Sequence, residues 1–337
     1  MKAREAIHRP VRRPALRAAM ALGLAGALAA AAPMAWAQKY PDKPIRLVVG
    51  YSAGGGVDAV ARLLATRLST ALGQQVMVEN RTGATGLIAA DVVAKSPADG
   101  YTLMMGDSGL LIAKLLQPKA AVDPLTHFKP VAGAFVSPLM IVTGNDFPAK
   151  TPAELVKELK AHPGRYSFAT SGVGTVQHLG FEMLKQSTGS TVVHVPYRGA
   201  AQIVPDVIGG QIPIGVVSAT AGMAQAKAGK LRALALMNTA KLEGVENVPP
   251  LADALPGFDV APRIFVLAPA GTPSEIVDRL SAAVKTVLDT PEAAAAAAAQ
   301  GTLRAYATPA QLGKDMVEET ARWKRIIAEQ HIVAEGN

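Results

Sequence analysis

Short apolar runs alternate with longer amphipathic stretches along this chain from about residue 40 onward. The runs Ile45–Gly50, Val76–Glu79 and Gly100–Met105 have the length and character of buried strands. Between them, residues 58–72 and 87–94 carry apolar side chains at helical spacing. Strands that alternate with helices predict a parallel sheet with helices on both faces, and a ligand edge at the carboxyl ends of the strands.

The same order of elements returns later in the chain. A strand at Tyr166–Ala169 leads through the small-residue loop 170–175 into a helix near Gln177, and a strand at Val192–Val195 leads toward a helix at Ala201–Ile208. Such repetition indicates a second α/β lobe. Further strands of this lobe are expected at 139–142, 214–217 and 231–237.

The last part of the chain is expected to return to the first lobe. A strand at Phe265–Ala268 precedes three helices, the first capped by Ser274 and the last opened by Thr308-Pro309. We predict an α/β fold in which lobe 1 comprises residues 38–140 and 260–337 and lobe 2 comprises residues 141–259. A ligand cleft is expected between the two lobes.

The first 37 residues have the pattern of a secretory signal peptide. A basic start is followed by an apolar run at 18–32 and by the A-x-A cleavage signal Ala35-Trp36-Ala37. No later stretch reaches the roughly eighteen apolar residues of a membrane span. We expect Met1–Ala37 to be cleaved and the mature protein to reach the periplasm without stable membrane insertion, by the general secretory or, given Arg12-Arg13, the twin-arginine route.

Removing the signal peptide changes the charge. It holds six of the 34 basic and one of the 26 acidic residues, so the mature chain has a net charge of +3, against +8 for the whole. With no basic block besides, the sequence predicts no nucleic-acid partner. The lack of cysteine excludes disulfides and thiolate metal sites, and the histidines lack metal-binding spacing.

The stretch Leu47–Leu68 joins a strand to a helix through three successive glycines, Gly54–Gly56. Glycines allow positive φ and let a ligand approach the backbone N–H groups closely. A helix start also offers unpaired donors and a partial positive charge, so that anionic groups bind well there. The alternative is a tight strand-to-helix connection without a ligand.

Two catalytic motifs are incomplete. Gly54-x-Gly56-x-x-Ala59, followed by Glu79, partly matches the dinucleotide fingerprint, but many such turns do, and a chain exported unfolded would have to find its nucleotide outside the cytoplasm. Gly106-Asp107-Ser108-Gly109 has the surroundings of a hydrolase serine, yet the mature chain has no histidine before Ser108 and Leu110 breaks G-x-S-x-G. We therefore predict no enzyme, no cofactor and no metal.

Three further residues are candidates for the cleft. His178 follows the second small-residue loop, and it either lines the cleft or is a histidine hydrogen-bonded on a helix flank. Tyr197 and Arg198 end a strand before Gly199, where a cleft role competes with the ordinary role of a solvated arginine.

Several motifs distributed over nearly all of the mature chain carry a family resemblance. They include Tyr40-Pro41-x-Lys43-Pro44, Asp99-Gly100-Tyr101-Thr102-Leu103, Thr170-Ser171-Gly172-x-Gly174-Thr175, His194-Val195-Pro196-Tyr197-Arg198-Gly199 and Ala268-Pro269-Ala270-Gly271-Thr272-Pro273. Together they resemble the tripartite tricarboxylate transporter receptors, the Bug family of periplasmic solute-binding proteins.

The resemblance implies a type II periplasmic-binding-protein-like Venus flytrap. It further implies that two loops, here Tyr51–Asp58 and Ser171–His178, grip a ligand carboxylate, partly through ordered water. The predicted ligand-binding residues are Tyr51, Ala53, Gly54, Gly55, Gly56, Asp58, Ser108, Ser137, Ser171, Gly172, Thr175, His178, Tyr197, Arg198, Gly199 and Ser218.

The sequence departs from the family pattern in several places. Asp107 stands where a neutral small residue is commoner, Lys241 where an arginine is usual, Pro250 where threonine is, and Pro262-Arg263 where an aromatic often lies. If either faces the cleft, we expect Asp107 to meet a cationic group or Arg263 to meet a second carboxylate.

The predicted function is that of an extracytoplasmic receptor, expected to be a monomer, which captures a small organic carboxylate for the membrane permease subunits of a tripartite tricarboxylate-type transporter. A periplasmic ligand sensor with a signalling partner is the first alternative, and an NAD-type oxidoreductase is the second. The sequence leaves the carboxylate open, because backbone N–H groups recognise only the group that all such ligands share.

Overall fold

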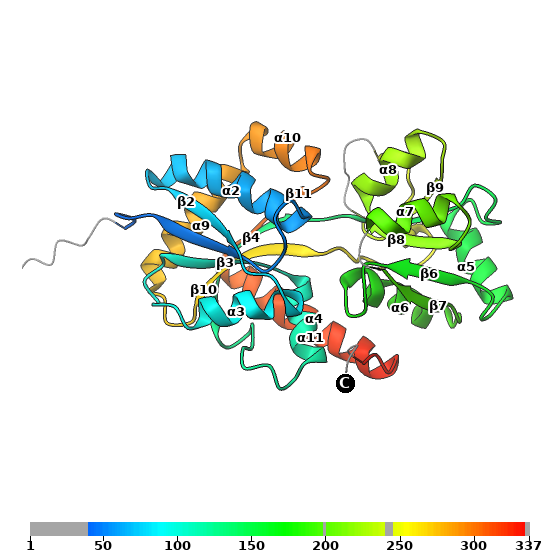
Figure 1. Cartoon of the computed structure of the whole chain (residues 1–337), viewed down its shortest axis with the longest axis horizontal. Coiled ribbons are helices and arrows are strands. Elements are labelled where there is room, and N and C mark those ends of the chain that lie inside the picture. The colour runs from blue at the N-terminus through cyan, green and yellow to red at the C-terminus, as the bar shows by residue number, and fades with distance from the viewer. Residues whose placement is uncertain (1–39, 198–199, 240–244, 334–337) are drawn as a thin grey trace, which may run out of the picture. The chain divides into compact units, whose positions relative to one another are not determined.

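The computed structural model describes residues 40–197, 200–239 and 245–333, and all its helices and strands lie in one compact unit, Lys43–Asn337. This unit contains two sheets, each covered by helices on both faces (Figure 1). The two-lobed α/β fold predicted from the sequence is therefore confirmed. The signal peptide predicted at Met1–Ala37 lies outside the described residues and stays a prediction.

The sheet of lobe 1 has six strands in the order β11-β4-β10-β3-β1-β2. Its strands are β1 (Ile45–Val49), β2 (Val76–Asn80), β3 (Thr102–Asp107), β4 (Phe128–Val136), β10 (Arg263–Pro269) and β11 (Leu303–Ala307). On one face lie α2 (Gly56–Leu72), α9 (Ser274–Leu288) and α10 (Pro291–Ala299), and on the other α3 (Leu87–Ala94), α4 (Ser108–Leu116) and α11 (Pro309–Glu329). The central strands β1 and β3 are almost wholly buried, which explains their continuous apolar sequence.

The sheet of lobe 2 has five strands in the order β7-β6-β8-β5-β9. Its strands are β5 (Leu139–Thr143), β6 (Ser167–Thr170), β7 (Val193–Pro196), β8 (Ile214–Ser218) and β9 (Arg232–Leu236). Its helices are α5 (Pro152–Ala161), α6 (Val176–Thr188), α7 (Ala200–Ile208) and α8 (Ala219–Lys227). Local sequence signals start α5, because the Thr151 side chain accepts a hydrogen bond from the Glu154 N–H and Pro152 is the first helical residue.

The lobes are joined where β4 passes into β5 and where the chain returns from β9 to β10. The two crossing segments touch, because the Ser137 N–H donates to the Pro262 carbonyl at 2.9 Å. Strands entering from the other lobe run against their neighbours. As a result, β10 is antiparallel to β3 and β4, and β5 is antiparallel to β8 and β9. The parallel pairing expected for the strands at 45–50, 76–79 and 100–105 is confirmed, because β1 is parallel to both β2 and β3, but each sheet as a whole is mixed.

Some elements differ from the sequence-based expectation. The helix α4 and the strands β4 and β11 were not predicted. The helix α4 begins at the residue directly after β3, so no linker marks it. Ser274 is the first residue of α9 and does not cap it, since the N-cap is Pro273 and no side chain caps the helix. Its hydroxyl instead accepts a hydrogen bond from Lys129 at 3.2 Å.

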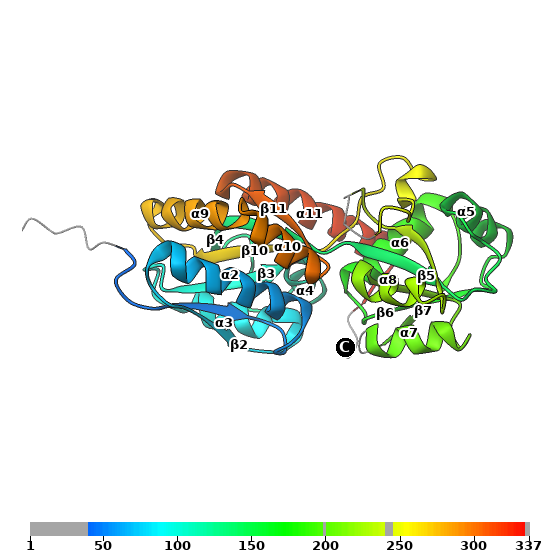
Figure 2. The same cartoon turned by 90° about the horizontal axis from the view of Figure 1, so that it is seen from above.

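The last helix reaches from lobe 1 into the core of lobe 2 (Figure 2). Trp323 on α11 has no exposed surface and belongs to the same buried cluster as Phe168 and Phe181. Its indole N–H donates to the Glu319 carboxylate at 3.0 Å. The helix is therefore a third connection between the lobes, made by packing and not by the chain crossing.

We predict that Trp323→Ala lowers the free energy of unfolding by about 3–5 kcal/mol, because it removes the largest fully buried side chain and leaves a cavity in lobe 2. Arg325→Ala, an exposed position on the same helix, is the control and should change stability by no more than about 0.5 kcal/mol. Denaturant unfolding at neutral pH checks both. Equal small losses for the two variants would show that α11 does not couple the lobes.

Candidate functional site

A cavity of about 440 Å³ lies where the two lobes meet the crossing segments; we call it the cleft cavity. Lobe 1 contributes Tyr51, Gly56, Val57, Thr85, Asp107, Gly109, Ile264, Gln300 and Thr302, lobe 2 contributes Ser171, Thr175, Val176, Gln177 and Ser218, and the crossings contribute Ser137 and Pro262. A carboxylate of several carbons fits such a volume. No lysine or arginine is among these described lining residues.

Among the described helices, α2, α4, α6 and α8 begin at the cleft cavity, each directly after the end of a strand or its loop. The first two residues of α2, Gly56 and Val57, line it, and so do the first two residues of α6, Val176 and Gln177. The first N–H groups of a helix have no intrahelical acceptor and carry partial positive charge. The cavity therefore offers backbone donors from both lobes to one anionic group.

The loop before α2 is held by Asp58, which is only 1% exposed. Its carboxylate accepts hydrogen bonds from the Gly54 N–H at 2.8 Å, Arg62 at 2.9 Å and the Asn80 amide at 2.8 Å. Burial raises the pKa of Asp58, but these hydrogen bonds outweigh it and lower the pKa to about 2. Asp58 is thus ionised and fixes the loop; it does not line the cavity.

The loop before α6 is held in the same way. His178 occupies the third position of its helix, as Asp58 does in α2, and its Nδ1 accepts the N–H of Gly174, four residues earlier, at 3.2 Å. Burial, with His194 and Lys185 nearby, lowers the pKa of His178 to about 3, so that the ring is neutral. Nδ1 can consequently accept a hydrogen bond, and His178 holds the loop through Gly174 without lining the cavity itself.

The start of α4 is different because its N-cap residue is acidic. Asp107 lines the cleft cavity, and its Oδ1 accepts a hydrogen bond from the Tyr51 hydroxyl at 2.7 Å. Burial raises the pKa of Asp107 to about 6, although Tyr51 and the N–H groups of Leu110 and Gly109 oppose that rise. The positive end of this helix therefore already has a carboxylate beside it.

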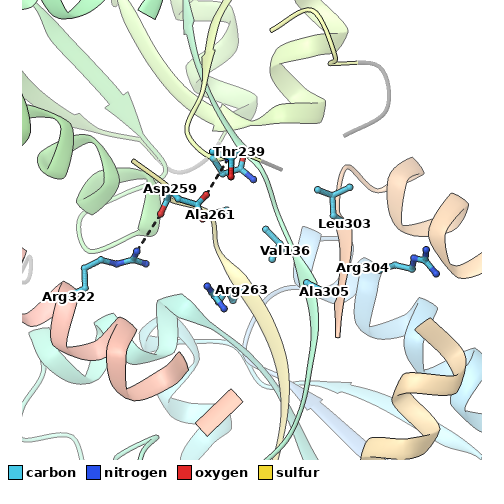
Figure 3. A pocket seen from close by; sticks show the side chains of 10 residues that line it. Val136, Thr239, Asp259, Ala261, Arg263, Leu303, Arg304, Ala305 and Arg322 are labelled. Atoms are coloured by element: carbon cyan, nitrogen blue, oxygen red, sulfur yellow. Dashed lines mark hydrogen bonds between the residues drawn. The ribbon is translucent and has the colours of Figure 1, made fainter. Parts of the chain in front are cut away.

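Arg263 lies on the opposite side of the crossing strands from the cleft cavity. Its neighbours Pro262 and Ile264 line the cavity, whereas Arg263 lines a second pocket of about 200 Å³, together with Asp259 and Arg322 (Figure 3). The alternation follows from the pleat of a strand. Arg263 there forms an ion pair with Asp315 at 2.7 Å. Asp107 thus faces the cleft cavity, which was the condition for expecting it to meet a cationic group. Arg263 does not face the cavity, so the condition for expecting it to meet a second carboxylate is not met.

The predicted ligand-binding residues divide into three groups. Those that line the cleft cavity are Tyr51, Gly56, Ser137, Ser171, Thr175 and Ser218. Described residues that are not among its lining are Ala53, Gly54, Gly55, Asp58, Ser108, Gly172, His178 and Tyr197. Arg198 and Gly199 lie outside the described residues, as does Lys241. Ligand contact by any of them stays a prediction.

Several residues of the second group are occupied by the protein itself. Ser108 is fully buried, and its hydroxyl accepts the Arg263 N–H at 2.9 Å. The Tyr197 hydroxyl donates to Asp206 at 2.7 Å. The Gly55 N–H donates to the Ser52 carbonyl at 3.1 Å, which closes a turn within the loop. The Ser108 and Tyr197 hydroxyls and the Gly55 N–H are therefore engaged within the protein.

Four lining residues were not predicted from the sequence: Thr85, Ile264, Gln300 and Thr302. Thr85 has a positive φ of 50°, rare for a β-branched residue, in a single 3₁₀ turn, η1 (Ala84–Gly86). The flanking Gly83 and Gly86 were the available signal for an unusual turn. Gln300 and Thr302 lie far along the chain, and nothing local in the sequence placed them here.

Comparison with known proteins identifies the family. The model of the tripartite tricarboxylate transporter family receptor matches residues 60–332. The chain is 34% identical to protein BugT of Bordetella pertussis, over 89% of this chain and 92% of BugT. This chain belongs to the tripartite tricarboxylate transporter receptor family.

Solved structures of similar proteins agree with this family assignment. The chain resembles Rpa4515 of R. palustris with adipate, at 31% identity and a TM-score of 0.76, over 87% of this chain and 99% of that one. It also resembles MatC of Rhodopseudomonas palustris with bound malate, at 30% identity and a TM-score of 0.70, over 86% and 100%. Receptors of this family are solute-binding proteins. In the described part of this receptor, no helix is long and apolar enough to cross a membrane.

We predict that Asp58→Asn lowers the free energy of unfolding by about 1–3 kcal/mol at neutral pH, because the charge-assisted hydrogen bonds to Arg62 and Gly54 are weakened. The folded pKa is depressed, so this contribution is present above about pH 4 and is lost as the pH falls toward 2. Denaturant unfolding at neutral and acidic pH measures it. Asp91→Asn, which removes an exposed pair with Lys95 at the same i,i+4 spacing, is the control and should be close to neutral.

A second prediction concerns Asp107. The pKa of Asp107 is higher in the folded protein than in the unfolded chain. The ionised carboxylate therefore lowers the free energy of unfolding above about pH 6, and this loss of stability disappears as the pH falls toward 4. Asp107→Asn should therefore unfold less readily than the unchanged protein at neutral pH, by about 1–3 kcal/mol, with a gap that closes in acid. Loss of stability at neutral pH would contradict the burial argument. Thermal and denaturant unfolding over this pH range provide the test.

Proposed function

We propose that this protein is an extracytoplasmic receptor that captures a small organic carboxylate in the cleft cavity and presents it to the membrane subunits of a tripartite tricarboxylate-type transporter. The observation that carries the proposal is the convergence of helix starts from both lobes on one cavity that has no basic side chain among its described lining. Donors of this kind suit a carboxylate. The adipate and malate held by two similar proteins are both small carboxylates.

Capture in such a site proceeds by contact with both lobes. The N–H groups at the starts of α2 and α6 belong to the helix backbone, which sets their direction. The loops before these two helices are held by Asp58 and His178. A carboxylate that bonds to both helix starts would bring the lobes together, and closure would exclude water and strengthen those bonds. No proton or electron has to move, so the proposed role is binding without catalysis.

The alternative function, an NAD-type oxidoreductase, has less support. Glu79, which would hold a ribose hydroxyl in a dinucleotide site, forms ion pairs with Arg46 at 2.8 Å and Arg81 at 2.6 Å. The Gly54 N–H, which would face a pyrophosphate, is taken by Asp58. Both groups required by the fingerprint are therefore already engaged.

Titration calorimetry of the mature protein tests the proposal with mono-, di- and tricarboxylates, aromatic acids and amino acids. We expect saturable binding of at least one carboxylate and none of NAD. A panel in which no carboxylate binds would overturn the receptor proposal.

A variant locates the binding. Gly56 lines the cavity, and a Cβ added there meets no atom within 4 Å, so Gly56→Val should change the melting temperature little. Because its side chain would occupy the space of the ligand, it should lower the affinity for the carboxylate at least about tenfold. Gly55 is less suitable because its Cβ would lie 3.2 Å from the Ser52 carbonyl. Gly313→Val, on α11 outside the cavity, is the control and should bind normally. Unchanged affinity of Gly56→Val would exclude the start of α2 from the site.

A further inference from the structure

Asp107 is the only charged side chain among the described residues that line the cleft cavity. The remaining lining side chains are hydroxyl, amide or apolar groups, besides glycines. A carboxylate ligand would therefore enter a cavity whose one described side-chain charge has the same sign as its own. The position of that charge must limit what the rest of the ligand can be.

Within residues 40–197, 200–239 and 245–333, the partners described for Asp107 are hydrogen-bond donors and none is a cation. Its described donors are the Tyr51 hydroxyl and the N–H groups of Leu110 and Gly109. The nearest described cation on the crossing strands, Arg263, faces the other pocket and pairs with Asp315. The other acidic group that acts on Asp107 is Glu319 on α11, which makes an uncharged ligand or a cation still more favourable there.

The charge discriminates between two kinds of ligand. A dicarboxylate would bring a second anion near Asp107 inside a partly buried site, where like charges repel more strongly than in water. A ligand with an ammonium group would instead place a cation beside Asp107, and a charge-assisted hydrogen bond is among the stronger polar contacts. The helix starts of α2 and α6 remain available for its carboxylate.

We propose that Asp107 makes this receptor selective for amino-carboxylates, with the ligand's ammonium group at Asp107 and its carboxylate at the helix starts of α2 and α6. This inference rests on the proposed function, since it assigns the second half of the same ligand. It makes Asp107 a specificity-determining residue of the cleft cavity.

The pH dependence of binding follows from the same contact. Burial raises the pKa of Asp107 to about 6, with Glu319 adding to the rise and Tyr51 and the N–H groups of α4 opposing it. Asp107 is therefore ionised at neutral pH and becomes protonated below about pH 6. Affinity for an amino-carboxylate should be full above that pH and fall below it, while affinity for a plain carboxylate should not fall in this way.

The test compares ligands of equal length by calorimetry at neutral pH. For the butanoate, pentanoate and hexanoate chains, the probes are the monocarboxylate, the dicarboxylate, and the amino acids with the amine at the α or the ω carbon. For at least one chain length we expect an amino-carboxylate to bind about tenfold to a hundredfold more tightly than the monocarboxylate and the dicarboxylate of the same length. If carboxylates bind but no amino-carboxylate is preferred, this inference is overturned while the proposed function stands. If nothing in the panel binds, both fail.

A pair of matched variants tests whether Asp107 causes the preference for amino-carboxylates. Asp107→Asn keeps the size and the acceptor for Tyr51 but removes the charge, and it should reduce the preference for the amino-carboxylate at least about tenfold and abolish its pH dependence. Glu158→Gln removes a carboxylate that likewise accepts a tyrosine hydroxyl, that of Tyr166, but does not line the cavity, and it should leave the preference unchanged. Equal effects of the two variants would overturn the assignment to Asp107.

Discussion

Backbone N–H groups at the starts of helices from both lobes must point into one cavity, and much of the surrounding structure serves that requirement. A helix start holds its donors rigidly, but the loop before it does not hold itself. In α2 and in α6 the third helical residue, Asp58 or His178, accepts the N–H of the glycine four residues earlier. One acceptor is a carboxylate with a lowered pKa and the other is a neutral imidazole. Two chemically different side chains thus perform the same task in the two lobes.

The described helix starts are not equivalent in charge. Those of α2 and α6 present donors to the cavity, whereas that of α4 is preceded by Asp107, whose carboxylate lies beside its own N–H groups. The hydrogen bonds from Tyr51 and from the N–H groups of α4 offset only part of the cost of burying this carboxylate, so the ionised acid opposes folding and stability does not explain its charge. A residue that costs stability and faces a binding cavity is better explained by what it binds.

Much of the fold could be predicted from the sequence, because buried strands such as β1 and β3 are continuous apolar runs and the caps of α5 and α11 are local signals. The direction of β10 could not, since this strand runs antiparallel to β3 and β4 where the chain returns from the other lobe. For the site, the two small-residue loops named from the sequence include residues that line the cavity, among them Gly56 and Ser171. Which of their N–H groups face it depends on partners such as Asp58, and Gln300 and Thr302 arrive from a distant turn, so neither follows from local sequence.

A structure of the mature protein determined with a bound carboxylate tests the central claim most directly. We expect the ligand's carboxylate oxygens within hydrogen-bonding distance of N–H groups of Gly56 or Val57 on one side and of Val176 or Gln177 on the other, directly or through one ordered water. A carboxylate held instead by a lysine or arginine side chain, with those helix starts left to solvent, would contradict the account.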